Sequence, residues 1–414
     1  MVSLSDKLKA LGVKVGARDL SPPRTRVGYP IEQVVAGQLQ PTPLGDTFVV
    51  EKLYAPTYRH GQVGLRPTAP LRTIAEWAGE TRLAACDLSS FAFLDTETTG
   101  LAGGSGTYAF LIGVGRFEGE HFRLAQFFMR DPTEEPAQLA ALTEFLRPCQ
   151  VLVTFNGKSF DAPLLQGRYI THGETFPLAG IPHLDLLHLA RRLWRDRLPS
   201  RTLGQLELHI LGAERTEEDT PGWVIPTLYF NYLRSDDARP LKGVFYHNAL
   251  DVLAMAALLN HTAHLLDDPL NSSVEHALDL VAIGKLLEDL GQLEPATRLF
   301  KLGLQRNDLP EESYWHIQRR LSFVHRRRGD LAAAIDIWQQ AAAGRQIYAH
   351  VELAKICEHK QRDYQAALRW TQTALELLDE RRQANPERRQ WLGDLRHRRA
   401  RLQRKLNKLR DQGQ

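Results

Sequence analysis

The chain contains few cysteines. Three occur in 414 residues, Cys86, Cys149 and Cys357, and they lie far apart. So few cysteines exclude a disulfide framework, and the lack of a Cys-x-x-Cys pair argues against the common zinc motifs. The chain also lacks an apolar run of about 18 residues. Its opening residues, MVSLSDKLKALGVKVG, lack the apolar core and small-residue cleavage site of a secretory signal. We therefore expect a cytoplasmic protein that does not span a membrane.

The chain has little net charge, and the total hides an uneven distribution. Its 52 Lys and Arg residues and 49 Asp and Glu residues give a formal net charge of +3. Residues 381–414 hold twelve basic and three acidic residues, which leaves 40 basic and 46 acidic residues in the rest of the chain. The sequence therefore predicts a basic C-terminal segment on a mildly acidic body.

The basic segment has the pattern of an amphipathic helix. Asn385 and Pro386 suit the cap and the first position of a helix. Basic residues surround an apolar stripe, so the helix either presents cations to a nucleic-acid backbone or only closes the end of the preceding helices. The stripe consists of Trp391, Leu392, Leu395, Leu402, Leu406 and Leu409.

The chain is long enough for two or three domains, and its regions differ in pattern. Residues 1–88 are interrupted by Pro and Gly and include a strand-like segment, TFVVEKLY, so we expect an N-terminal extension of short strands and loops. Residues 89–266 alternate strand and helix patterns, which predicts a mixed sheet covered by helices. The expected strands are 91–95, 108–117, 121–130 and 151–155, and the expected helices lie near 134–147, 160–170, 185–196, 203–210 and 241–265.

Residues 275–380 are helical in pattern and contain an internal repeat. The segments LGQLEPATRLFKLGL, RGDLAAAIDIWQQAA and QRDYQAALRWTQTAL superpose, with Ala296, Ala334 and Ala367 at one shared position. A glycine stands in the preceding turn of the first two segments, whereas Arg362 stands in the third. A period near 34 residues with small residues at fixed positions resembles tetratricopeptide repeats, and an ordinary helical bundle is the alternative.

Two carboxylates stand at the end of an apolar strand. Asp95 and Glu97 lie two residues apart in the segment FAFLDTETTG, and such residues point to the same side of a strand. Like charges at the rim of a core are unfavourable unless a cation neutralises them. A divalent metal is the natural neutraliser, and ligands that offer only oxygen favour magnesium or manganese.

Two further segments carry acidic residues at defined positions. TFNGKSFD places Asp161 in the first turn of a helix, where a carboxylate serves a site or only stabilises the helix N-terminus. In YHNALD, His247 and Asp251 are roughly 40° apart around a helix, whereas Tyr246 and Asp251 are roughly 140° apart. His247 is therefore the better partner for Asp251, although a lone helical His is often structural.

The three motifs DTETTG, NGKSFD and His-x-x-x-Asp, in this order, resemble the DnaQ-like exonucleases with a ribonuclease H-like fold. The resemblance covers about residues 89–266 and looks closest to the YprB-like branch, which often carries tetratricopeptide repeats. It implies that Asp95, Glu97, Asp161 and Asp251 are the four signature acids. It further implies that these acids bind two Mg²⁺ or Mn²⁺ ions and hydrolyse phosphodiester bonds from the 3′ end of single-stranded DNA or RNA.

The motif around the last acid departs from the family pattern. One branch of the superfamily has a His five residues before the last Asp, and another has a Tyr four residues before it, whereas here the two residue types are exchanged. We expect His247 to be the general base, because a His titrates near neutral pH and this one faces Asp251. Tyr246 is the alternative. The residues expected to contact the substrate are Thr98, Gly100, Asn156, Lys158 and Tyr246.

A third group of polar residues consists of residue types that commonly bind metal ions. His183, Asp185 and His188 are close in sequence, but Asp185 is better placed as the N-cap of the helix over 186–196. The sequence as a whole thus predicts a metal-dependent nuclease followed by a tetratricopeptide-like helical region that could bind a protein partner. The alternatives are a vestigial nuclease fold that acts as a binding scaffold, and a nucleotide phosphohydrolase with the same two-metal chemistry.

Overall fold

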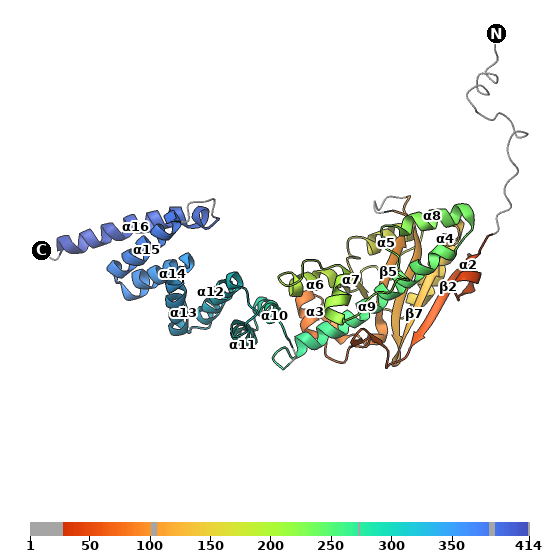
Figure 1. Ribbon diagram of the computed structural model, residues 1–414, viewed down its shortest axis with the longest axis horizontal. Coiled ribbons are helices and arrows are strands. Elements are labelled where there is room, and N and C mark those ends of the chain that lie inside the picture. The colour runs from red at the N-terminus through yellow and green to blue at the C-terminus, as the bar shows by residue number, and fades with distance from the viewer. Residues whose placement is uncertain (1–27, 101–105, 272–273, 381–385, 413–414) are drawn as a thin grey trace, which may run out of the picture. The chain divides into compact units, whose positions relative to one another are not determined.

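The computed structural model describes residues 28–100, 106–271, 274–380 and 386–412 (Figure 1). The chain divides into two compact units. The first comprises Met1–His188 and Thr202–Ala263, and the second comprises Leu189–Arg201 and His264–Gln414. The second unit therefore includes a short segment from within the predicted nuclease region.

A mixed seven-stranded sheet forms the centre of the first unit, with the strand order β1-β2-β7-β6-β5-β8-β9. β6 is antiparallel to both of its neighbours, β5 and β7, whereas β8 and β9 run parallel to β5. This arrangement confirms the predicted fold class. The strands are β1 Gln38–Thr42, β2 Gly45–Tyr54, β5 Phe91–Thr98, β6 Ala109–Glu118, β7 His121–Phe128, β8 Val151–Thr154 and β9 His183–Asp185, while β3 Arg59–His60 and β4 Val63–Gly64 pair separately.

The central strands follow from their apolar sequences. Residues 109–115 of β6 are buried throughout, as expected for a strand covered on both faces. β6 and β7 join through a two-residue turn at Gly119 and Glu120, where Gly119 has a φ of 56°. In β5, Phe91 to Leu94 are buried and the following residues are half-buried. Asp95 and Glu97 thus lie where the strand leaves the core.

The N-terminal region contributes directly to this sheet. The predicted strand TFVVEKLY lies within β2, which pairs with β7 along its length, and β1 adds the edge strand. The strands β1 and β2 of the predicted extension are therefore integral to the central sheet. Residues 1–27 lie outside the described residues.

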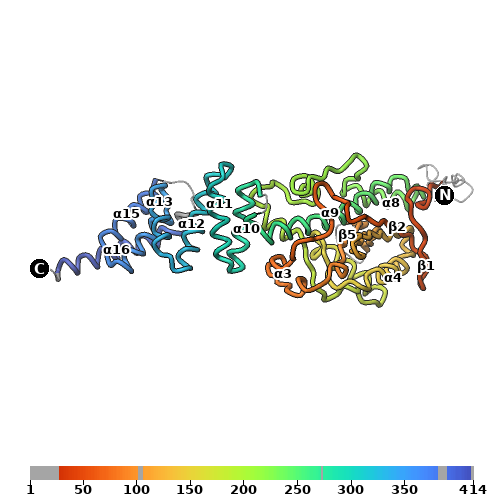
Figure 2. Tube along the Cα trace, turned by 90° about the horizontal axis from the view of Figure 1, so that it is seen from below, coloured from red at the N-terminus to blue at the C-terminus, as the bar shows by residue number. Residues whose placement is uncertain are grey.

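Helices cover both faces of the sheet, as Figure 2 shows for α4 on one side and α8 and α9 on the other. Neighbouring strand residues point to opposite faces, so Phe127 packs against the α4 side and Phe128 against the α8 side. The helices are α2 Ile31–Val34, α3 Arg72–Ala78, α4 Glu135–Leu146, α5 Asp161–Thr171, α6 Leu186–Trp194, α7 Leu203–Leu206, α8 Ile225–Ser235 and α9 Lys242–Asp267.

The helix that spans Arg239–Asp267 corrects one expectation. By length and composition it is apolar enough to cross a membrane, although the sequence has no uninterrupted apolar run of about 18 residues. However, 72% of its most apolar window is buried inside the protein. Phe245 of this helix packs against Phe128 of β7, with ring centroids 5.3 Å apart. Its apolar composition is therefore explained by its place against the sheet.

The second unit is helical, which confirms the prediction for the C-terminal region. Ala296, Ala334 and Ala367 are fully buried in its helices, as small residues are where helices approach closely. The turns before these helices are left-handed at Gly291 and Gly329, and Arg362 adopts the same conformation with a φ of 58°. The helices are α10 Ala277–Asp289, α11 Leu293–Leu304, α12 Glu311–Arg327, α13 Leu331–Ala343, α14 Ile347–Ile356, α15 Tyr364–Glu380 and α16 Pro386–Gln412.

Candidate active site

The acidic pair of β5 lies at an irregular end of the strand. Asp95 is opposite Gly113 of β6, and Glu97 is opposite Leu111. The pairing register then shifts between Glu97 and Thr98. Such irregularities end the regular ladder and re-aim side chains, and they are frequent beside active sites. The two carboxyl groups therefore leave the sheet at the point where its hydrogen-bonding pattern breaks.

A buried amide network holds the carboxyl group of Asp95. Asn248 of α9 donates from Nδ2 to Asp95 Oδ2 at 2.8 Å. Gln126 of β7 in turn donates from Nε2 to Asn248 Oδ1 at 2.9 Å and to the carbonyl oxygen of Phe245 at 2.8 Å. A Cβ atom on Gly113 would lie only 2.2 Å from Asn248 Oδ1. A glycine is therefore required at this position of β6 for α9 to reach Asp95.

Asp161 reaches the same region from the first turn of α5. Its carboxylate accepts a hydrogen bond from the hydroxyl of Thr96, the residue between the two acids of β5. The loop before α5 turns sharply at Asn156, which has a left-handed φ of 68°. This conformation is tolerated by Asn better than by most residues, and it directs the chain from β8 back toward the acids.

Asp185 fixes that loop and caps the next helix. Its buried carboxylate accepts from the backbone N–H groups of Asn156 at 2.8 Å and Lys158 at 3.1 Å. It also accepts from the N–H of Leu187 at 3.1 Å, which confirms the predicted N-cap of α6. Asp185 thus supports the position of Asp161 from behind. The sequence had indicated only the capping role.

His247 and Asp251 face each other on α9, as their spacing predicted. His247 Nε2 lies 3.7 Å from Asp251 Oδ2, and His247 Nδ1 lies 2.8 Å from Asp219 Oδ1. A neutral His247 that donates from Nδ1 to Asp219 has an unprotonated Nε2 directed at the acids. Asp219 lies outside the three sequence motifs, so the sequence did not indicate its contact with His247.

Tyr246 lies apart from the acids. Its hydroxyl accepts from Thr216 Oγ1 at 3.1 Å, and its side chain lines a separate cavity of about 290 Å³ with Tyr54 and Tyr58. Lys158 is exposed, and its side chain does not line the cleft beside the acids. The expected substrate contacts that do line that cleft are Thr98, Gly100 and Asn156.

The pKa values of all four carboxyl groups are raised, by burial in each case and also by repulsion from the other acids at Asp95 and Glu97. Burial, then repulsion by Asp251, Glu97 and Asp161, raises the pKa of Asp95 well above its usual value. Burial and repulsion by Asp251 and Asp161 raise the pKa of Glu97 to about 8. Burial also raises the pKa of Asp161 to about 6 and that of Asp251, the latter against the opposing effect of neighbouring cations. The site is therefore deficient in positive charge.

The chemistry of these residues fits a divalent metal. Four carboxylates offer only oxygen donors, which suit Mg²⁺ or Mn²⁺, and a bound cation would relieve their repulsion. Across the described part of the chain, no three His, Cys, Asp or Glu side chains form a group arranged to hold a metal ion. Three of the carboxyl groups instead have protein partners, namely Thr96, Asn248 and Arg215.

An open cleft of about 440 Å³ begins at the acids. Asp95 and Asp161 lie in its wall, together with Phe155 and Phe160. The side chain of Phe160 is 53% exposed, an unusual fraction for a large aromatic residue. The cleft therefore combines carboxylates with an accessible apolar ring, which are suitable groups for a phosphodiester and a base.

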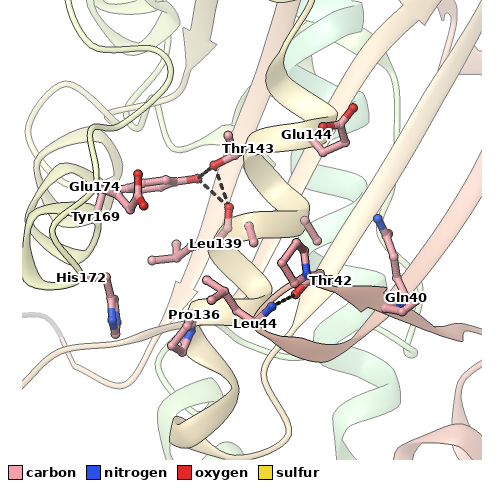
Figure 3. A pocket seen from close by; sticks show the side chains of 14 residues that line it. Gln40, Thr42, Leu44, Pro136, Leu139, Thr143, Glu144, Tyr169, His172 and Glu174 are labelled. Atoms are coloured by element: carbon pink, nitrogen blue, oxygen red, sulfur yellow. Dashed lines mark hydrogen bonds between the residues drawn. The ribbon is translucent and has the colours of Figure 1, made fainter.

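A second pocket, of about 620 Å³, lies elsewhere on the first unit (Figure 3). It is formed by the hairpin of β1 and β2, by α4 and by the end of α5, and none of the expected site residues lines it. Two of its polar groups are already paired, since Tyr169 donates to the carbonyl of Leu139 at 3.0 Å and His172 bonds to Glu135 at 2.7 Å. We therefore place the candidate site at the smaller cleft.

Comparisons with known proteins agree with this location. Residues 92–263 match the family model of the RNase_H superfamily, and this range contains all four acids. The chain is also similar to an uncharacterized protein, YprB of Bacillus subtilis (strain 168), with 29% identity over 332 residues that cover 78% of each chain. Residues 92–263 thus have a ribonuclease H-like fold, and proteins of that superfamily are generally nucleases or other hydrolases. The DnaQ-like branch and the tetratricopeptide repeats stay predictions.

Proposed function

We propose that this chain is a metal-dependent nuclease that removes nucleotides from the 3′ end of single-stranded DNA or RNA. The observation that supports the proposal most is the set of four half-buried carboxyl groups with raised pKa values beside an open cleft. Such a cluster is unfavourable without a neutralising cation. The match to the RNase_H superfamily supports phosphodiester hydrolysis as the reaction class.

Asp95, Glu97, Asp161 and Asp251 would hold two Mg²⁺ or Mn²⁺ ions in this proposal. When bound, such ions lower the pKa of a water molecule and stabilise charge on the leaving oxygen. His247 Nε2 takes the proton of the attacking water, while Asp219 holds the imidazole through Nδ1.

The cleft supports a single-stranded substrate. The exposed ring of Phe160 offers a face for a base that has left its stack, and base stacking on an aromatic ring is tolerant of sequence. Thr98 and Asn156 provide polar contacts in the same wall. A strand end with unpaired bases satisfies these groups better than a duplex does.

Digestion of end-labelled oligonucleotides tests the activity. Single-stranded and double-stranded DNA and RNA, labelled at the 5′ end, would be incubated with the full chain in Mg²⁺ or Mn²⁺. We expect a ladder of products shortened from the 3′ end on a single-stranded substrate, and no products in a chelator. Intact substrates under every metal condition would instead favour the binding scaffold, and release of phosphate from free nucleotides alone would favour a nucleotide phosphohydrolase.

His247→Ala is expected to lower kcat in this assay by about 10²–10⁴, the usual range for loss of a general base. Tyr246→Phe is the matched control, because it removes a hydroxyl that bonds only to Thr216 in the structure. We expect the control to stay within about twofold of the unchanged chain. Equal losses in the two variants would contradict the assignment of His247.

The charges of α16 divide into an inner and an outer set. Arg398, Arg401 and Lys405 bond to the fully buried carboxylate of Glu358, at 2.7, 2.8 and 3.1 Å. These bonds lower the pKa of Glu358 to about 2 against the effect of burial. Of the predicted apolar stripe, Leu395 and Leu402 are buried while Leu409 is 52% exposed; Asn385 lies outside the described residues. The inner cations therefore have a structural role.

The outer set remains available for a partner. Arg396, Arg399 and Arg404 are exposed, and among the described residues they form no ion pair. We propose that they contact the phosphate backbone of the substrate, and that the helical unit as a whole is a tetratricopeptide-like stack that could also bind a protein.

Neutralising the outer arginines tests this surface. The triple change Arg396→Gln, Arg399→Gln and Arg404→Gln should weaken oligonucleotide binding. It should also make the slope of the log binding constant against the log salt concentration shallower by about 2, since each phosphate contact contributes about 0.7 on a single strand. Binding is measured by fluorescence anisotropy titration. A control variant with three other exposed arginines replaced should leave this slope unchanged. An equal slope in both triples would remove α16 from the interface. The control changes are Arg72→Gln, Arg82→Gln and Arg147→Gln, which affect exposed arginines already paired with neighbouring glutamates.

A further inference from the structure

Arg215 connects the candidate site to a second, buried acid. Its Nη2 atom donates to Asp251 and to Glu207, and its Nε atom donates to Glu207 at 2.7 Å. Its Nη1 atom lies 3.5 Å from Asp219 Oδ2. The side chain is only 17% exposed. One guanidinium therefore spans a signature acid and two carboxylates that lie outside the four-acid motif.

Glu207 holds this guanidinium in place from the protein interior. The side chain of Glu207 is 1% exposed. The residue begins the π-helical turn Glu207–Leu211. Its second oxygen, Oε1, lies 2.8 Å from His60 Nε2 in the β3–β4 hairpin. The same hairpin is tied to the turn by Gln62, whose N–H donates to the carbonyl of Leu211 at 2.7 Å. Arg215 is therefore anchored by Glu207 independently of its bond to Asp251.

The charge on Arg215 acts on the acids that are expected to bind metal. Its guanidinium opposes the increase in the pKa of Asp251 and of Glu97, which burial causes in both residues. A divalent cation that binds Oδ1 of Asp251 would take the oxygen that Nη2 now occupies. Arg215 could release this oxygen and keep both of its bonds to Glu207, so the exchange would break one charge-assisted hydrogen bond.

We propose that Arg215 is a positioning residue that neutralises Asp251 in the metal-free protein and competes with a divalent cation for that carboxylate. The inference rests on the proposed function, because it presumes that Asp251 is a metal ligand. The buried pair of His60 and Glu207 sets the strength of the competition by holding Arg215 within reach.

Titration of chelator-treated protein with Mn²⁺, followed by calorimetry, tests the competition. Arg215→Gln should bind Mn²⁺ about tenfold more tightly than the unchanged chain, the factor expected when a charge-assisted hydrogen bond no longer opposes binding. In a chelator, the same variant should unfold at a lower temperature, and Mn²⁺ should raise its Tm more than that of the unchanged chain. A residue that only supports the fold would give the opposite result, a weaker affinity for Mn²⁺.

Two variants make the outcome unambiguous. Arg130→Gln removes another arginine with two carboxylate partners, Glu32 and Glu134, and should lower Tm without changing Mn²⁺ affinity. Arg215→Lys retains the charge without the planar fork, so its Mn²⁺ affinity should lie between those of the unchanged chain and Arg215→Gln. This variant provides the test if Arg215→Gln does not fold. Unchanged or weaker Mn²⁺ binding in the Arg215 variants would overturn the inference alone. Absence of Mn²⁺ binding to the unchanged chain would overturn the proposed function as well.

Discussion

Asp95→Asn is expected to abolish nuclease activity and, at the same time, to stabilise the metal-free protein. Activity should fall by more than about 100-fold, because even residues that only orient metal ligands contribute about 10–100-fold. The amide can still accept the hydrogen bond from Asn248 and needs no proton, whereas the metal-free Asp95 must either take up a proton or be repelled by three neighbouring acids. In a chelator, Tm should therefore rise by a few degrees, as measured by differential scanning calorimetry.

A matched change at an ordinary acid should have the opposite effect on stability. Asp131 caps a helical turn, and its hydrogen bonds to the hydroxyl and the N–H of Thr133 lower its pKa. Asp131→Asn should leave activity unchanged and lower Tm slightly. If Asp95→Asn resembled this control, with full activity and a reduced Tm, Asp95 would be a structural acid and the proposed function would be wrong.

The second large effect concerns pH. In a chelator, the free energy of unfolding should decrease by about 1 kcal/mol per pH unit between pH 6.5 and 8.5, because one proton is worth about 1.4 kcal/mol per unit. Burial raises the pKa of Glu97 to about 8, whereas the unfolded chain loses this proton near pH 4.5. The folded protein therefore binds more protons over this interval, and its stability is lost as the pH rises through the folded pKa.

Urea denaturation at several pH values measures this slope. The interval begins at pH 6.5 because burial lowers the pKa of His183 to about 4. Below pH 6.5 this residue makes the free energy of unfolding increase with pH, which opposes the effect of Glu97. Glu97→Gln should flatten the slope, and so should Mn²⁺, which keeps the acids ionised when it binds. A slope of zero in the metal-free, unchanged chain would contradict the repulsion between the acids.

Features that depend on neighbours in the sequence were predictable. The apolar runs gave the antiparallel pair β6 and β7, and helical geometry placed His247, and not Tyr246, beside Asp251. The strand TFVVEKLY was also predicted, but its pairing with β7 was not, because a strand pattern does not name its partner. α8 was missed because its segment follows a Pro-Gly turn that was assigned to a loop.

The partners of the acids were not predictable for a related reason. Asn248 lies inside the recognised motif, yet its supporting residue, Gln126, is 122 positions away. Arg215 reaches Asp251 from an irregular segment, and it is held there by Glu207 of the preceding helical turn. Spacing in a sequence reports only local geometry, whereas these contacts depend on how separate elements pack. The catalytic roles and the cytoplasmic location stay predictions.

The interleaving of the two units limits how the protein can be dissected. Leu189–Arg201 belongs to the helical unit although nuclease sequence flanks it on both sides, and Arg197 pairs with Asp279 at 2.8 Å while Lys285 pairs with Asp196 at 2.9 Å. A chain truncated before α10 would keep this segment but lose the partners of its charged side chains. A self-contained nuclease module therefore requires two alterations, removal of the C-terminal helices and replacement of an internal segment.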